Sequence, residues 1–186
     1  MKNLLKLNKK TLLKLINDID INKIELLATT IKKFKNSKNK IIILGNGGSA
    51  SISTHVSVDL SKNAGIRSTN FNEANLITCL ANDYGHDNWM KEALSIHCKK
   101  KDIVIFISSS GESPNILNAS NWCNKNKVKM ITLTGFKKNN SLQKNNKKGI
   151  NFWINSKAYN HVELCHLYIL LSAVDMIIGK LVYKFN

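Results

Sequence analysis

Two runs of hydrophobic residues, 41–44 and 103–107, are each followed by a loop of small residues and then by a helical pattern. Continuous β-branched and aliphatic runs are typical of parallel strands that are covered on both faces. A strand, a short turn and a helix in this order form a β-α unit. The chain is therefore predicted to have an α/β fold with a parallel sheet.

The same kinds of pattern predict the other elements. Apolar side chains at helical spacing predict helices over residues 10–18, 22–36, 74–81, 88–99 and 113–125, and a long apolar helix from Tyr159 to about Tyr183. Further strands are expected at 128–133 and 150–154, a turn at 82–85 and an exposed loop at 137–148. We expect residues 1–186 to be one domain, in which the helical segment 1–38 packs in an oligomer because its apolar faces need partners.

The chain is strongly basic, with 28 Lys and Arg against 12 Asp and Glu and a net charge of +16. Such a charge is typical of nucleic-acid binding, but Arg67 is the only arginine and no nucleic-acid-binding motif is present. We expect a solvated basic surface without direct nucleic-acid binding, which leaves weak attraction to acidic partners open.

Compartment and redox state follow from simple counts. The four cysteines form no Cys-x-x-Cys pair, which indicates neither a zinc ribbon nor a disulfide framework. The lysine-interrupted N-terminus is unlike a signal peptide, and no apolar run reaches the length of a membrane span. The expectation is a cytoplasmic protein without a membrane partner.

The two loops after the hydrophobic runs are candidate phosphate sites. Small residues let the backbone approach an anion, hydroxyls donate to it, and a helix N-terminus adds unpaired N–H groups. Each loop alone is equally well explained as a tight turn. Two such loops at consecutive strand ends favour phosphate binding, with these candidate ligands: Asn46, Gly47, Gly48, Ser49, Ser108, Ser109, Ser110 and Ser113.

Four segments carry a family resemblance: LGNGGSAS, LANDYG, ISSSGESPNILNA and ITLTGF. Together they resemble the sugar isomerase (SIS) domain, specifically the phosphoheptose isomerase group, over about residues 40–180. The resemblance implies a three-layer α/β/α sandwich with a five-stranded parallel sheet, N-terminal helices and a long C-terminal helix. It also implies a homotetramer or homodimer with a sugar phosphate bound at subunit interfaces. The serines of the second loop, Ser108, Ser109, Ser110 and Ser113, would then hold the phosphate. Asn46, Gly47, Ser49 and Asp83 would contact the sugar.

Aldose–ketose isomerisation through an enediol needs a base near carbon and an acid near the oxygens. His55 and Asp59 are four residues apart on one predicted helix face, and Glu163 and His166 are three apart on another. Without the resemblance, each is better explained as a solvated or core-edge side chain. The family has Glu as the base at position 59 and His as the acid at position 171, where this chain has Asp59 and Leu171.

These departures define the catalytic and metal candidates. Asp59 is the predicted base, with Glu163 or His166 as a changed acid. Some family members bind zinc at the positions of His55, Asp59, Glu163 and Leu171, which makes the first three tentative ligands and zinc a candidate cofactor.

The resulting prediction is an intramolecular oxidoreductase that isomerises sedoheptulose 7-phosphate or a related sugar phosphate for heptose and surface polysaccharide synthesis. The alternative is a non-catalytic module that senses a phosphosugar or serves in assembly, because Leu171 cannot transfer a proton.

Overall fold

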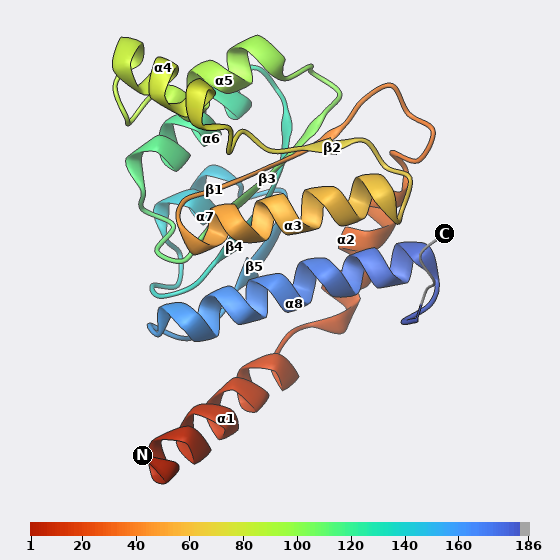
Figure 1. Cartoon of the computed structure of the whole chain (residues 1–186), viewed down its shortest axis with the longest axis vertical. Coiled ribbons are helices and arrows are strands. Elements are labelled where there is room, and N and C mark those ends of the chain that lie inside the picture. The colour runs from red at the N-terminus through yellow and green to blue at the C-terminus, as the bar shows by residue number, and fades with distance from the viewer. Residues whose placement is uncertain (183–186) are drawn as a thin grey trace.

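The computed structural model describes residues 1–182, which form a three-layer α/β/α sandwich around one parallel sheet (Figure 1). The five strands lie in the order β2-β1-β3-β4-β5. Their bounds are β1 Ile41–Gly45, β2 Ser68–Thr69, β3 Ile103–Ser108, β4 Lys129–Thr134 and β5 Ile150–Trp153. The predicted α/β fold with five parallel strands is confirmed.

The helices divide between the two faces of the sheet. Their bounds are α1 Lys2–Asn17, α2 Ile21–Lys32, α3 Gly48–Lys62, α4 Ala74–Tyr84, α5 Trp89–His97, α6 Pro114–Lys125, α7 Ser141–Asn145 and α8 Tyr159–Ile178. One core is formed with α2, α3 and α8, and the other with α4, α5, α6 and α7. Helix α1 projects from the first layer, as Figure 1 shows.

Strand β1 explains why the hydrophobic runs are continuous. Ile41 and Ile43 point into the core beneath α3 and α8, while Ile42 and Leu44 point into the core beneath α5 and α6. Successive strand side chains alternate between faces, so a sheet covered on both sides needs apolar residues at every position. All four residues are at most 1% exposed.

The structure corrects several predicted boundaries. Residues 82–84 are the last turn of α4 instead of a free turn, and Gly85 ends the helix at a φ of 80°. The predicted loop 137–148 contains the short helix α7, and strand β2 was not expected from its residues. Helix α8 ends earlier than predicted, because Gly179 adopts a left-handed conformation; Tyr183 lies outside the described residues.

Helix α8 is also long and apolar enough by composition to cross a membrane. Half of its most apolar window is buried inside the fold, where it contacts α2 and α3. This is the burial that a core helix of an α/β domain requires.

A buried carboxylate ties the starts of β1 and β3 together. Asp102 is 1% exposed and accepts hydrogen bonds from the backbone N of Lys40 and Lys99, both at 2.9 Å. The Lys40 ammonium lies 2.9 Å from the same carboxylate. Burial raises the pKa of Asp102, but the hydrogen bonds from Lys99 and Lys40 outweigh it, so the pKa is lowered overall.

Replacing Asp102 with Ala is expected to lower the free energy of unfolding by about 3 kcal/mol, because it leaves the Lys40 ammonium and two backbone N–H groups without their buried acceptor. Urea unfolding at pH 7 measures this loss. Because the folded pKa is lowered, the stabilisation is fully present above the unfolded pKa of about 4 and is lost below it, as the pH falls through the folded pKa. Exposed Asp87→Ala is the control; an equal, small effect of both variants would contradict this role.

Candidate functional site

The two small-residue loops lie side by side at the carboxyl edge of the sheet. Strands β1 and β3 are paired in parallel, with Gly45 opposite Ile107. Helix α3 starts at Gly48 directly after the first loop, and α6 starts at Pro114 directly after the second. Ligands of open α/β sheets bind beyond the carboxyl ends of strands, and helix N-termini favour anions there.

The first loop requires glycine at two positions. Gly47 has a φ of 53° and a ψ of −123°, which is unfavourable for other residues. A Cβ on Gly45 would lie 2.7 Å from Ser49, so the strand and helix approach too closely for a side chain. The buried Ser49 therefore lies in the first turn of α3, directly above the strand end.

The second loop is held in shape by its own polar groups and by α7. The Ser108 hydroxyl accepts a hydrogen bond from Gly111 N at 3.2 Å, and Gly111 has a φ of 66°. The Glu112 carboxylate accepts from Ser141 N at 2.9 Å, and hydrogen bonds from Ser141 lower the pKa of Glu112. This support organises the loop in the free protein.

The serine hydroxyls differ in their engagement. Ser110 accepts from Glu112 N at 3.2 Å, whereas Ser113 is the N-cap of α6 and makes no side-chain hydrogen bond to the helix. Ser109 is buried, and its carbonyl accepts from Gly135 N at 2.9 Å. Ser113 thus presents a hydroxyl at the positive end of α6, where a phosphate oxygen would be favoured.

A reciprocal amide pair connects the two loops. Asn46 Nδ2 donates to Asn115 Oδ1 at 3.0 Å, and Asn115 Nδ2 donates back to Asn46 Oδ1 at 2.9 Å. Asn115 is 1% exposed. Sequence reasoning missed Asn115, because nothing in a single sequence indicates that residues 69 positions apart form a pair.

Glu163 reaches the first loop from α8. A Cβ on Gly48 would lie 2.5 Å from a Glu163 carboxylate oxygen, so this carboxylate packs directly on the first residue of α3. Gly48 therefore serves close packing between the helices. The structure brings the predicted residue Glu163 to the first loop, although it is more than 100 residues away from that loop in the sequence.

His55 and Asp59 lie on one accessible face of α3, as their spacing predicted. His55 Nε2 is 3.4 Å from an Asp59 carboxylate oxygen, and the His55 and Asp59 side chains are 55% and 18% exposed. Asp59 also accepts from Asn63 Nδ2 at 3.0 Å. Burial and the Asp59 charge raise the pKa of Asp175 on α8.

Within one chain, Asp59 and Glu163 are far apart. Glu163 packs on Gly48, and eleven residues of helix separate Gly48 from Asp59. At 1.5 Å per residue this is roughly 16 Å along the axis. Across residues 1–182, no three His, Cys, Asp or Glu side chains gather closely enough to hold a metal ion. His55, Asp59 and Glu163 of one chain thus do not fit a zinc site.

Two other α8 residues considered for proton transfer, His166 and Leu171, pack against the core. His166 is fully buried, and its Nε2 lies 3.2 Å from the Thr134 carbonyl oxygen, while Nδ1 has no partner. Burial lowers the pKa of His166 to about 4. Leu171 is partly buried against the core.

Asp83 makes its side-chain contacts with Asn82 and Cys79, its neighbours in α4.

Comparisons with known proteins agree with this geometry. Residues 8–135 match the SIS domain family. The chain belongs to the SIS domain family. Curated relatives include the phosphoheptose isomerase of Buchnera aphidicola subsp. Schizaphis graminum, 30% identical over 86% of this chain and 87% of that protein. Phosphoheptose isomerase 2 of Campylobacter jejuni is 34% identical over 56% of this chain and 55% of its own length.

Solved structures have the same fold as this SIS domain. The phosphoheptose isomerase of Neisseria gonorrhoeae has a TM-score of 0.85 at 18% identity, covering 95% of this chain and 98% of that one. That of Francisella tularensis has a TM-score of 0.85 at 23% identity, covering 96% of both chains. The three-layer SIS fold expected from the resemblance is confirmed.

Asn46→Ala and Asn115→Ala are expected to show an energetic coupling of about 1–2 kcal/mol in a double-mutant cycle, because each removes the same partly buried amide pair of the SIS domain. Urea unfolding of wild type, both single variants and the double variant gives the coupling. Additive effects within about 0.3 kcal/mol would show that the pair does not connect the loops energetically.

His166 is expected to make the SIS domain less stable as the pH falls from about 6.5 to about 4. The folded pKa is lowered, so the unfolded chain binds the proton first; the full effect is about 3 kcal/mol. Unfolding free energies of wild type and His166→Met measured across this range give its share. Exposed His86→Gln is the control and should keep the wild-type slope; an unchanged slope in His166→Met would contradict the assignment.

Proposed function

We propose that this SIS protein is an aldose–ketose isomerase of a sugar phosphate, with sedoheptulose 7-phosphate or a close relative as substrate. The observation that carries the proposal is the pair of preorganised anion loops, joined by Asn46 and Asn115, with carboxylates on the adjoining helices. The curated relatives named phosphoheptose isomerase support this substrate class. A charged sugar phosphate is a cytoplasmic metabolite, which is consistent with a cytoplasmic role in heptose and surface polysaccharide synthesis.

The loops are proposed to bind the two ends of the substrate differently. Ser108, Ser109, Ser110 and Ser113 would hold the phosphate at the N-terminus of α6, where hydroxyls and N–H groups favour a dianion. Asn46, Gly47, Gly48 and Ser49 would contact the sugar hydroxyls from the first loop, and Asp83 would approach them from the end of α4. Holding the phosphate fixes the position of the reacting carbons.

The proton transfer is assigned to carboxylates. Asp59 would remove the proton from the carbon next to the carbonyl and return it to the neighbouring carbon, through an enediol. Glu163 would donate to and accept from the oxygens. His166 is less suited to this step, because its pKa of about 4 keeps it neutral and its Nε2 faces the Thr134 carbonyl.

Two chains are proposed to complete each site. Roughly 16 Å along α3 separates the Asp59 and Glu163 ends of one chain, which is too far for both to act on adjacent atoms. The outer faces of α3 and α8 expose apolar side chains, including Val58, Leu164 and Tyr168. Such a face is typical of a subunit interface, so we propose a homodimer or homotetramer.

The N-terminal segment 1–38 is proposed to pack in the same oligomer. Helix α1 projects from the body, and Leu15 is its one buried residue among those described. Leu4, Leu5 and Leu7 are each more than 60% exposed. A second chain that covers these leucines would stabilise α1.

Replacing Asp59 with Asn is expected to lower kcat for sedoheptulose 7-phosphate at least about 100-fold, because the variant has no base. Conversion to the aldose, followed by chromatography, measures the rate, and exposed Asp87→Asn is the matched control. Loss of less than half the activity in Asp59→Asn would contradict the assignment. Wild-type protein that binds the sugar without converting it would instead support the non-catalytic alternative, which Leu171 favours.

Co-expressed Asp59→Asn and Glu163→Gln chains are expected to regain activity that neither variant has alone. If each site takes Asp59 and Glu163 from different chains, a mixed dimer contains one site with both native residues. Differently tagged chains allow the mixed species to be purified before the assay. Activity restricted to wild-type chains, with none in the mixed species, would place both residues of a site in the same chain.

A further inference from the structure

Strand β2 is an edge of the sheet, and a hollow of about 710 Å³ runs along it. Every residue from Gly65 to Phe71 lines this hollow. The remaining lining residues come from neighbouring elements: Lys40, Ser61, Leu76 and His97. We call it the β2 groove. It lies at the start of β1, whereas the candidate site lies at the opposite end of that strand.

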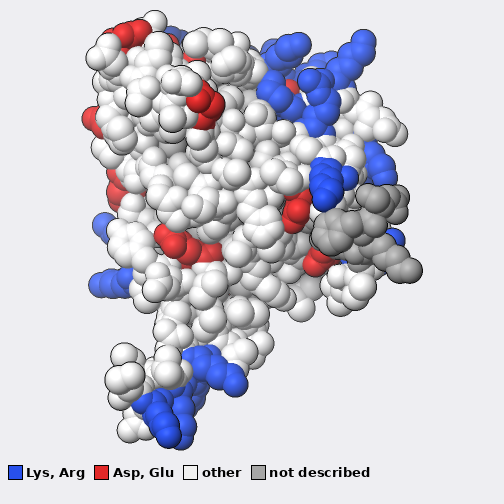
Figure 2. Space-filling model, in the orientation of Figure 1, with Lys and Arg blue, Asp and Glu red and all other residues white. Residues whose placement is uncertain are grey.

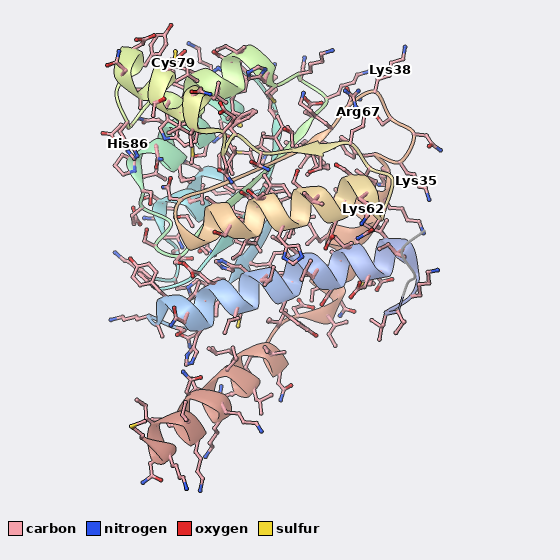
Figure 3. All side chains as sticks on the ribbon, in the orientation of Figure 1. Lys35, Lys38, Lys62, Arg67, Cys79 and His86 are labelled. Carbon is pink, nitrogen blue, oxygen red and sulfur yellow. The ribbon has the colours of Figure 1, made fainter. Side chains whose placement is uncertain are left out.

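Exposed cations surround the β2 groove, and Figure 2 shows Lys and Arg gathered on this part of the surface. Figure 3 places Lys35, Lys38 and Arg67 together at this end of the molecule. The basic rim consists of these three residues with Lys99 and Lys100, all exposed. Arg67 lines the groove itself, and the four lysines are within five residues of Lys40 or His97 in the chain. Among the described residues, none of the five forms an ion pair with an acidic side chain.

Asp102 lies in the same connecting segment as Lys99 and Lys100, but its carboxylate does not neutralise the lysines of the rim. Asp102 is 1% exposed and already binds Lys40. Helix C-termini also favour cations, which accounts for Lys62 and His97 at the ends of α3 and α5. Lys35, Lys38, Lys99 and Lys100 lie beyond helix ends in connecting segments, where that effect has faded.

The backbone N–H and C=O of Ser68 in β2 make only long hydrogen bonds, to the Ser61 side chain. Ser68 N donates to the Ser61 hydroxyl at 3.3 Å, and the Ser61 hydroxyl donates to the Ser68 carbonyl at 3.3 Å. Both distances are long for hydrogen bonds. A rotation of the Ser61 side chain would free both backbone groups for an incoming strand, the mode by which extended peptides add to sheet edges.

We propose that the β2 groove binds an acidic, extended segment of another protein, which adds beside β2 and directs its carboxylates to the basic rim. The rim repels a second copy of the same edge while attracting a strand of opposite charge. A protein segment is favoured over nucleic acid, because the rim is mostly lysine and the exposed large aromatics of residues 1–182 are elsewhere: Tyr84, Tyr159 and Tyr168.

Fluorescence anisotropy of a labelled eight-residue peptide that alternates Glu and Val tests this proposal at low salt. We expect the acidic peptide to bind the full-length protein at least tenfold more tightly than a Lys-Val peptide. A version with alternate backbone nitrogens methylated should also bind at least tenfold more weakly, because it cannot pair with β2. Equal binding of either comparison peptide would overturn the proposal.

Charge reversal locates the site. Lys38→Glu combined with Lys100→Glu is expected to weaken binding of the acidic peptide at least tenfold, whereas Lys6→Glu combined with Lys9→Glu on α1 changes it less than twofold at the same net charge. Circular dichroism verifies folding; if the first variant unfolds, Lys38→Ala with Lys100→Ala replaces it, with at least threefold weakening expected. Equal losses in rim and α1 variants would overturn the location.

A single-stranded oligonucleotide with the same number of charges separates the two classes of polyanion. We expect it to bind more weakly than the acidic peptide. Tighter oligonucleotide binding that is lost in the rim variant would overturn the choice of a protein partner and identify a nucleic-acid surface. Sugar-phosphate turnover should be unchanged in the rim variant, so this test is independent of the proposed isomerase.

Discussion

The parallel direction of all five strands is the constraint on which the rest of the molecule depends. Because every strand runs in the same direction, all amino ends lie on one side of the sheet and all carboxyl ends on the other, and the two sides differ chemically. Helices that follow the strands bring their N-termini to the carboxyl edge, where the two small-residue loops lie. Their C-termini and the connecting lysines lie at the amino edge. The proposed anion site at the carboxyl ends of the strands and the excess positive charge at their amino ends both follow from one topology.

Two polar ties hold β1 and β3, the central pair, at opposite ends. Asp102 joins the segments that lead into these strands, and Asn46 with Asn115 joins the segments that leave them. The apolar contacts between the strands are non-directional, but these hydrogen bonds specify geometry. The loops therefore retain their relation in the free protein, so less ordering is needed when an anion binds.

The sequence allowed prediction of features whose signals are local. Continuous apolar runs located the strands β1 and β3, because both faces of the sheet are covered, and apolar residues at helical spacing located helix α6. Strand β2 has two residues and no such run, so it was missed. The Asn46–Asn115 pair and the packing of Glu163 on Gly48 depend on tertiary folding, which no local pattern encodes. Histidine is a residue type that can transfer protons, so His166 was a candidate from the sequence. Its buried environment depends on how α8 packs on β4, which the sequence pattern does not show.

The arrangement of α3 and α8 supports the proposal that a second chain completes the site. Glu163 meets Gly48 near the start of both helices, and Figure 1 shows α3 and α8 running side by side in the same direction. A two-fold axis perpendicular to such a pair makes the facing helices of the second chain run in the opposite direction. The Asp59 end of one chain then approaches the Glu163 end of the other. In the proposed symmetric dimer, the separation of Asp59 and Glu163 within one chain would become a juxtaposition between two chains, and the exposed apolar faces of both helices would supply the contact.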